Sequence, residues 1–191
     1  MELALQQKLV ARLVTDREFR ESFFANPAKV AAHEGLTVAA EGLAQMHHEQ
    51  LRQFARLLRT RRLAQVSVQM PLTRRALGMR FADLFRNYAV NPQPGKRPFE
   101  DGLGFAKYLE EYASAEQLGP EWALSIARYE AAKIEATWLD RRLTVRFLPH
   151  AARRLATMLK TGDVPPGSYH RPSVAIWWRA TESSRLKHWL W

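Results

Sequence analysis

The histidine and acidic residues of this sequence do not form a known metal-binding or acid–base motif. Two adjacent histidines precede Glu49, but neighbouring residues of a helix point in different directions and lack the i, i+4 spacing of a two-histidine metal site. The other four histidines fall in separate predicted elements, so only folding can bring them together: His33, His150, His170 and His188. We therefore expect no metal ion or other cofactor in this chain.

The sequence also lacks the short motifs of common enzymes. It has no cysteine, which excludes disulfides, thiolate zinc sites, iron–sulfur clusters and cysteine nucleophiles. It has no G-x-S-x-G nucleophile motif, no G-x-x-x-x-G-K-[ST] phosphate loop and no G-x-G-x-x-G dinucleotide motif. We therefore predict that the chain is not an enzyme by itself.

The strongest charge signal is an arginine-rich stretch in the middle of the chain. The 191 residues carry 29 Lys and Arg against 19 Asp and Glu, a formal charge of +10, which favours acidic partners. Arg52, Arg56 and Arg59 recur at helical spacing and are candidates for binding nucleic-acid phosphates. They also fit a solvated helix face whose arginines pair with acids such as Glu49. Nucleic-acid binding is therefore the alternative function.

Hydrophobic periodicity predicts helices before residue 140 and strands only after it. The longer predicted helices cover 48–68, 73–88, 100–112 and 120–139, with a proline-rich loop at 91–98. Strands are predicted at 143–148, 172–179 and 186–191, with a helix at 151–160 between the first two. We predict an α+β fold with a helical domain at 1–140 and, packed on it, a small antiparallel sheet of three strands at 141–191.

The predicted sheet is also the candidate functional site. Neighbouring strand residues point to opposite faces, so the outward tryptophans either cover the helical body or form an apolar platform for a partner. The last strand is expected at the sheet edge, where unpaired N–H and C=O groups can bind an extended peptide as a further strand. The candidate peptide-binding residues are Val174, Ile176, Trp178, Leu186, His188, Leu190 and Trp191.

Nothing in the sequence indicates a membrane segment. No apolar run is long enough for an ordinary transmembrane helix, and Met1–Lys8 lacks the basic-then-apolar order of a signal peptide. We therefore expect a cytoplasmic protein without membrane association.

Several short motifs, spread over most of the chain, resemble those of one protein family. They are L-V-T-D-R-E-F-R at 13–20, F-A-N-P at 24–27, F-A-R at 54–56, M-P-L-T-R-R-A-L-G at 70–78, A-R-Y-E at 127–130 and A-I-W-W-R at 175–179. Together they resemble the MbnC-like partner proteins, which are encoded beside multinuclear non-haem iron oxidative enzymes.

This resemblance implies a function. The chain would form a heterodimer with the iron enzyme, would carry no iron itself, and would help to hold the leader segment of a ribosomally synthesised precursor peptide. In that family the enzyme modifies cysteines of the precursor, and in methanobactin biosynthesis the products are oxazolone and thioamide groups of a copper-binding peptide. A chain with a net charge of +10 would favour an acidic leader.

Overall fold

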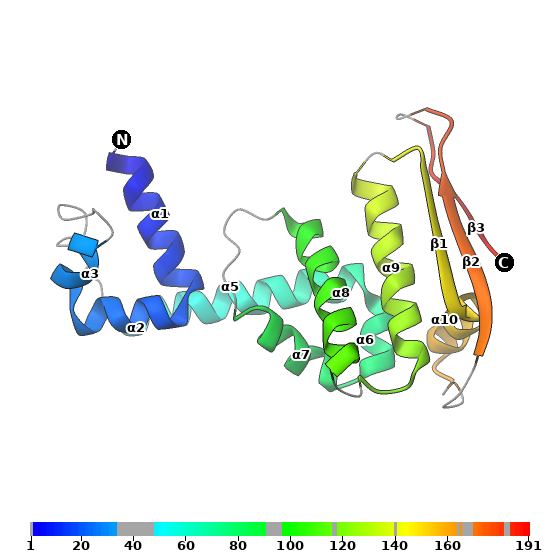
Figure 1. Cartoon of the computed structure of the whole chain (residues 1–191), viewed down its shortest axis with the longest axis horizontal. Coiled ribbons are helices and arrows are strands. Elements are labelled where there is room, and N and C mark those ends of the chain that lie inside the picture. Colours follow the sequence, from blue (N-terminus) through cyan, green and yellow to red (C-terminus); the bar gives the residue numbers. More distant parts are fainter. Residues whose placement is uncertain are drawn as a thin grey trace. The chain divides into compact units, whose positions relative to one another are not determined.

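The computed structural model describes residues 2–33, 48–90, 97–115, 118–139, 141–163, 165, 170–181 and 184–191. Helices occupy most of these residues, and the strands lie in the last third of the chain (Figure 1). The predicted α+β class, with a small antiparallel sheet of three strands near the C-terminal end, is confirmed. The predicted loop at 91–98 falls largely outside the described residues. Within the described ranges, no helix is long and apolar enough to cross a bilayer.

The chain divides into two compact units. The first comprises residues 1–62 and 86–96, and the second comprises residues 63–85 and 97–191. This division does not fall at residue 140, where the sequence suggested a domain boundary. The reason is that strand β1 (Leu143–His150) packs directly on helix α9 (Trp122–Trp138), so the sheet and the helix before it belong to one unit.

The first unit is helical. It contains α1 (Glu2–Thr15), α2 (Arg17–Ala25), α3 (Pro27–His33) and the beginning of α5 (His48–Gln69). Two clusters of buried apolar side chains join α1, α2 and α5: Leu9, Leu13, Val14, Phe19, Phe23, Leu51 and Ala55. Removing this apolar surface from water is what holds the short helices together, because helices of this length are marginal alone.

Two polar side chains fix where the short helices of the first unit begin. Asp16 caps α2, since its Oδ1 accepts a hydrogen bond from the N–H of Phe19 at 2.9 Å. Asn26 caps α3 in the same way, accepting from the N–H of Lys29 at 3.0 Å. Each cap satisfies a backbone donor that the helix itself leaves without a partner.

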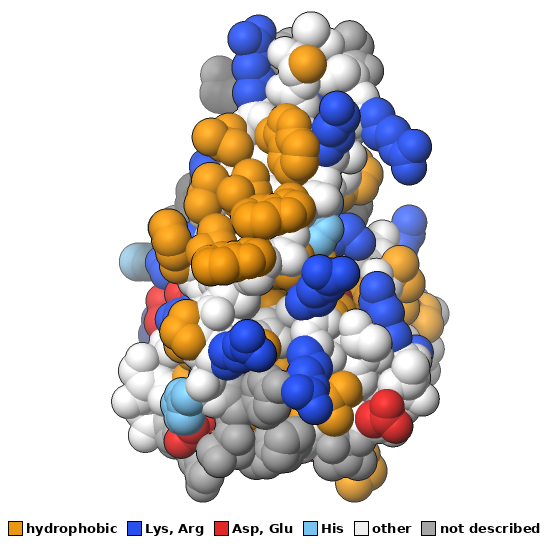
Figure 2. Space-filling view, turned by 90° about the vertical axis from the view of Figure 1, so that its right-hand side faces the viewer, with side chains coloured by type: hydrophobic (Ala, Val, Ile, Leu, Met, Phe, Trp, Pro, Cys, Tyr) orange, Lys and Arg blue, Asp and Glu red, His pale blue; other side chains and the backbone are white. Residues whose placement is uncertain are grey.

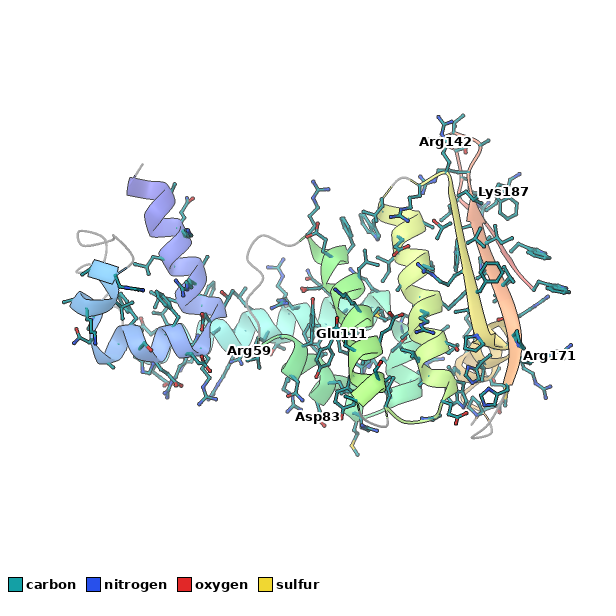
Figure 3. The ribbon with its side chains drawn as sticks, in the orientation of Figure 1. Arg59, Asp83, Glu111, Arg142, Arg171 and Lys187 are labelled. Atoms are coloured by element: carbon teal, nitrogen blue, oxygen red, sulfur yellow. The ribbon has the colours of Figure 1, made fainter. Side chains whose placement is uncertain are left out.

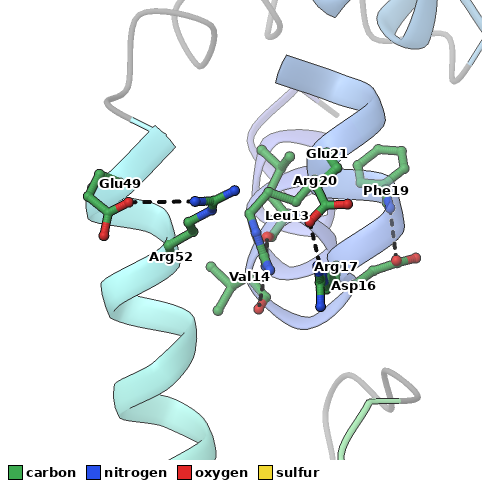
Figure 4. Close-up of polar contacts among 9 residues, drawn as sticks. All are labelled: Leu13, Val14, Asp16, Arg17, Phe19, Arg20, Glu21, Glu49 and Arg52. Carbon is green, nitrogen blue, oxygen red and sulfur yellow. Dashed lines mark hydrogen bonds and ion pairs between the residues drawn. The ribbon is translucent and has the colours of Figure 1, made fainter. Parts of the chain in front are cut away.

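Arg20 caps the C-terminal end of α1 (Figure 4). It is buried, and its Nη1 donates to the carbonyls of Leu13 at 2.8 Å and Val14 at 3.3 Å. These carbonyls belong to the last turn of α1, where the helix offers no N–H partner. Burial lowers the pKa of Arg20, and the nearby positive charge of Arg59 lowers it further.

Two arginines of the second unit also bind carbonyls of helices. Arg75 Nη1 donates to Leu159 O at 2.6 Å and Lys160 O at 3.1 Å, near the end of α10 (Ala152–Thr161). Arg179 Nη2 donates to Ala136 O at 2.6 Å, near the end of α9. Part of the chain's positive charge therefore stabilises helix ends rather than a binding surface.

The helices of the second unit include α6 (Pro71–Leu77), most of α7 (Arg80–Tyr88) and α8 (Pro98–Ala115). The prediction of a single helix at 73–88 is wrong, because Gly78 adopts a φ of 55° and separates α6 from α7. This left-handed region is open to glycine and strained for most other residues. The aromatic ring of Phe105 in α8 meets Phe81 and Phe85 of α7 edge-on, with ring centroids 5.2 and 5.3 Å apart.

A buried carboxylate joins α6 to α9. Glu130 Oε1 accepts from the N–H of Leu72 at 2.9 Å, and Oε2 accepts from the N–H and the Oγ1 hydroxyl of Thr73, each at 2.8 Å. Burial raises the pKa of Glu130, while these three hydrogen bonds oppose that shift. Glu130 thus satisfies the first donors of α6 and fixes that helix against α9, which in turn supports the sheet.

The sheet has the strand order β1-β2-β3, and both neighbouring pairs are antiparallel. Strand β2 (His170–Trp178) is central and β3 (Lys187–Leu190) is short. On the inner face, Ala175 and Trp177 of β2 pack against Ala132 and Ala136 of α9. The small alanine side chains let the sheet approach the helix closely, so Ala175 and Trp177 are buried, whereas His188 on the same side of the sheet stays exposed.

Candidate functional site

The sheet face turned away from α9 is almost entirely apolar. Because strand residues alternate between faces, every second side chain of β1, β2 and β3 points outward. The register aligns these side chains in three rows across the sheet, which we call the outer face: Phe147, Val174 and Trp191; Val145, Ile176 and Trp189; Leu143, Trp178 and Lys187. Eight of these nine positions are apolar, so this side of the sheet is not a normal solvated surface.

The largest side chains of the outer face are exposed. Phe147 retains 75% of its accessible surface and Trp191 retains 77%. The rings of Trp189 and Trp191 are stacked with centroids 6.5 Å apart. Figure 2 shows hydrophobic side chains gathered over this face. A large, rigid aromatic surface of this kind is typical of protein interfaces, where aromatic residues serve as anchors.

Positive charges surround the apolar rows. Arg142, Arg171 and Lys187 lie around the sheet (Figure 3), and all three are exposed. Figure 2 shows Lys and Arg side chains on several sides of the apolar area. The combination of an apolar centre and a basic rim favours a partner that carries both apolar and acidic residues.

Two cavities lie beside Trp191. One of about 320 Å³ is lined by residues of β1 and β2, including Phe147, Pro172 and Val174. The other, of about 520 Å³, is lined by Leu190 and by three arginines: Arg153, Arg154 and Arg171. The first suits an apolar side chain and the second suits an acidic one, because of the charges at its wall.

Strand β3 presents its backbone at one edge of the sheet. Val174 and Trp191 exchange two backbone hydrogen bonds of 3.0 Å, which fixes the alternation along this pair of strands. It follows that the N–H and C=O groups of Trp189 point toward β2, whereas those of His188 and Leu190 point away from it. Among the described residues no strand pairs with this edge of β3.

The structure places the predicted peptide-binding residues on both faces of the sheet. Four of them lie on the outer face: Val174, Ile176, Trp178 and Trp191. The side chains of Leu186 and Leu190 pack against the inner core instead. The ring of His188 lies 4.8 Å from Trp177 and 5.7 Å from Tyr129, also on the inner side. These last three side chains are therefore not part of the apolar outer face, although the backbone of His188 and Leu190 reaches the edge.

The sequence-based prediction did not include the other four apolar residues of the outer face: Leu143, Val145, Phe147 and Trp189. The signal for the first three was present, since they are alternate apolar residues of one strand. Thr144 and Leu148, which alternate with them, are buried on the other side. Only the register shows which set faces the helices.

The three arginines of the alternative nucleic-acid site lie in the part of α5 that belongs to the first unit. Arg56 is exposed, and Arg52 Nη1 lies 3.9 Å from Glu49 Oε2, the pairing that a solvated helix face predicts. Arg59 Nε donates to Ala55 O of its own helix at 3.3 Å. Two of the three thus have partners within the protein, and this geometry by itself points to no ligand.

Part of the chain resembles one known family. A model of the SCO6045-like, C-terminal domain matches residues 34–111, which is less than half of the 191 residues. The match ends within α8, before α9 and the sheet begin, so the outer face lies outside it. No curated protein and no solved structure matches the chain.

Proposed function

We propose that this chain is the non-catalytic partner subunit of an iron-dependent oxidative enzyme that modifies a ribosomally synthesised peptide. In this proposal the outer face and the edge of β3 bind the leader segment of the precursor peptide. The sequence motifs suggest the kind of partner, and the observation that carries the proposal is the apolar outer face beside an open strand edge.

The leader peptide would bind as a fourth strand next to β3. Its backbone would hydrogen-bond with the N–H and C=O groups of His188 and Leu190, which point away from β2. Every second side chain of the leader would then lie on the outer face, next to Trp189 and Trp191. The backbone contacts supply affinity and the alternate side chains supply specificity.

Electrostatics make an acidic leader the expected ligand. The chain has a formal charge of +10, and Arg153, Arg154 and Arg171 line the cavity at the end of β3. Exposed charges attract at long range and are screened by salt, so they mainly raise the association rate. Leader binding should therefore slow at high ionic strength without being abolished.

In this scheme the chain contributes binding rather than chemistry. Iron belongs to the partner enzyme, which converts cysteines of the precursor, and methanobactin-type oxazolone and thioamide groups are the proposed products. Holding the leader beside the enzyme raises the local concentration of the cysteines to be modified. The active site of the enzyme can then modify them even if it binds the cysteine segment only weakly.

The first test is co-expression of the tagged chain with the protein encoded beside it, followed by measurement of complex mass and iron content. The proposal predicts a one-to-one complex that contains iron, while the chain purified alone contains none. A chain that purifies alone and instead retains nucleic acid through moderate salt contradicts the proposal and supports the Arg52, Arg56 and Arg59 alternative.

The second test concerns the edge of β3 and compares two substitutions of one residue. Leu190→Ala and Leu190→Pro both remove the side chain that packs on the inner core, but only Leu190→Pro removes the N–H that points to the open edge. We expect Leu190→Pro to bind the leader more weakly than Leu190→Ala when both are folded by circular dichroism. Equal affinities for the two variants contradict strand addition at this edge.

A further inference from the structure

Folding brings together three possible metal ligands from three different elements of the second unit. Glu121 precedes α9, His150 ends β1 and His170 begins β2. One ligand atom from each lies within 4.8 Å of the other two. His170 Nε2 is 2.8 Å from Glu121 Oε2, and the rings of His150 and His170 are 4.9 Å apart. The two histidines are 20 residues apart in the sequence, and no spacing rule predicts that they meet.

His150 is the unusual member of the group. It is buried, with 4% of its surface exposed, and its Nε2 has no hydrogen-bond partner in the described part of the chain. Its other ring nitrogen, Nδ1, lies 2.7 Å from the Oγ of buried Ser125. When Nδ1 carries the proton and donates to Ser125, Nε2 holds a free lone pair. A buried nitrogen without a partner needs an explanation, and a bound cation provides one.

The surroundings also orient the His150 ring. Ser125 fixes the ring through Nδ1, which is the role that a hydrogen-bond partner of a metal-ligating histidine commonly has.

The donor set identifies the class of metal. Two imidazole nitrogens and one carboxylate oxygen suit Zn²⁺ and related divalent transition metals, whereas Ca²⁺ and Mg²⁺ prefer oxygen ligands throughout. Three protein ligands leave one tetrahedral position for water. Glu121 and His170 are exposed, so an ion can reach the site from solvent without unfolding of the sheet.

We infer that Glu121, His150 and His170 form a zinc-type metal site that ties the start of α9 to the neighbouring ends of β1 and β2. The inference does not depend on the proposed function, because it concerns side chains that the outer face does not use. A metal ion bound there would link the start of α9 to the end of β1 and the start of β2, and so would hold the sheet against α9.

The test uses the full chain without a histidine tag, stripped with a chelator and titrated with Zn²⁺ against a chromophoric competitor. We expect one tight site and a higher melting temperature with zinc. Glu121→Gln and His170→Ala change exposed residues and should each weaken zinc binding at least about tenfold, since even outer-shell changes commonly cost this much. The matched control is His33→Ala, an exposed histidine of the first unit, which should bind zinc as wild type does.

Co²⁺ gives a second readout, because its visible absorption reports a nitrogen- and oxygen-ligated site directly. The wild type and His33→Ala should show the same cobalt spectrum, and His170→Ala should lose it. Failure of the wild type to bind either metal overturns the inference. So does unchanged zinc affinity in a folded Glu121→Gln, His170→Ala double variant, which would mean that Glu121 and His170 form only a surface ion pair.

Discussion

Replacing the buried Glu130 with glutamine tests the link between the helices and the sheet. The carboxylate accepts hydrogen bonds from two backbone N–H groups and one hydroxyl, all at 2.8–2.9 Å. Glutamine has nearly the same shape but only one accepting oxygen, so the N–H of Leu72 or of Thr73 loses its acceptor. A buried donor without a partner costs about 1–3 kcal/mol. For a chain of this size that corresponds to a melting temperature lower by about 2–12 °C.

Tryptophan fluorescence is the appropriate assay for this variant. All six tryptophans lie in the second unit, at or after residue 122, so their emission follows the unfolding of that unit alone. The matched control is Glu111→Gln, an exposed acid of α8 (Figure 3), which should stay within about 0.5 kcal/mol of wild type. A Glu130→Gln variant that is as stable as this control would refute the role assigned to Glu130.

The same variant predicts a pH dependence with a definite sign. Burial raises the pKa of Glu130, so the folded protein keeps the proton to a higher pH than the unfolded chain does. The stability advantage of wild type over Glu130→Gln should therefore shrink as the pH rises from about 4.3, the pKa of an unperturbed glutamate, through the raised folded value. An advantage that grows over this range would mean that the three hydrogen bonds outweigh burial.

Three further substitutions have expected outcomes. Arg20→Ala removes the buried donor to the last carbonyls of α1 and should destabilise the first unit by about 1.5–3 kcal/mol, measured by circular dichroism in urea; no change in the midpoint would contradict its capping role. Gly162→Ala places a Cβ at a φ of 87° and should lower the free energy of unfolding by about 1–2 kcal/mol, and Gly162→Asn should lower it less. Equal stability of wild type and both variants would exclude the left-handed conformation. Arg171→Glu should weaken binding of an acidic leader mainly through the association rate in stopped-flow measurements at low salt, and a salt-independent rate in the wild type would contradict steering.

Local signals in the sequence were sufficient to predict much of the fold. Asp16 and Asn26 act as helix caps because their side chains reach a backbone N–H three residues further along the chain. The end of α10 at Gly162 could be predicted for the same reason, because a left-handed glycine at a helix end depends only on local backbone angles. The strand composition near Val145 and Ile176 likewise indicated a sheet, and the two residues are indeed paired.

Contacts between distant residues could not be predicted in this way. Glu130 caps a helix that begins 59 residues earlier in the chain, at Pro71, and no spacing rule connects them. The outer face depends on the register, because a shift of one residue would exchange Phe147 with buried Leu148. His150 and His170 meet only because they are partners at the irregular end of the β1–β2 pair.

Binding of the leader peptide to an outer-face variant tests the central claim most directly. The measurement is the dissociation constant, by fluorescence anisotropy, of a labelled acidic leader peptide from the proposed precursor. Phe147→Ala and Trp191→Ala together remove two exposed aromatic rings, and aromatic anchors commonly contribute 2 kcal/mol or more, so we expect a loss of at least about tenfold. Phe54→Ala removes a 50% exposed ring of α5 and serves as the matched control. A folded double variant that binds the leader as tightly as wild type and Phe54→Ala would contradict the account.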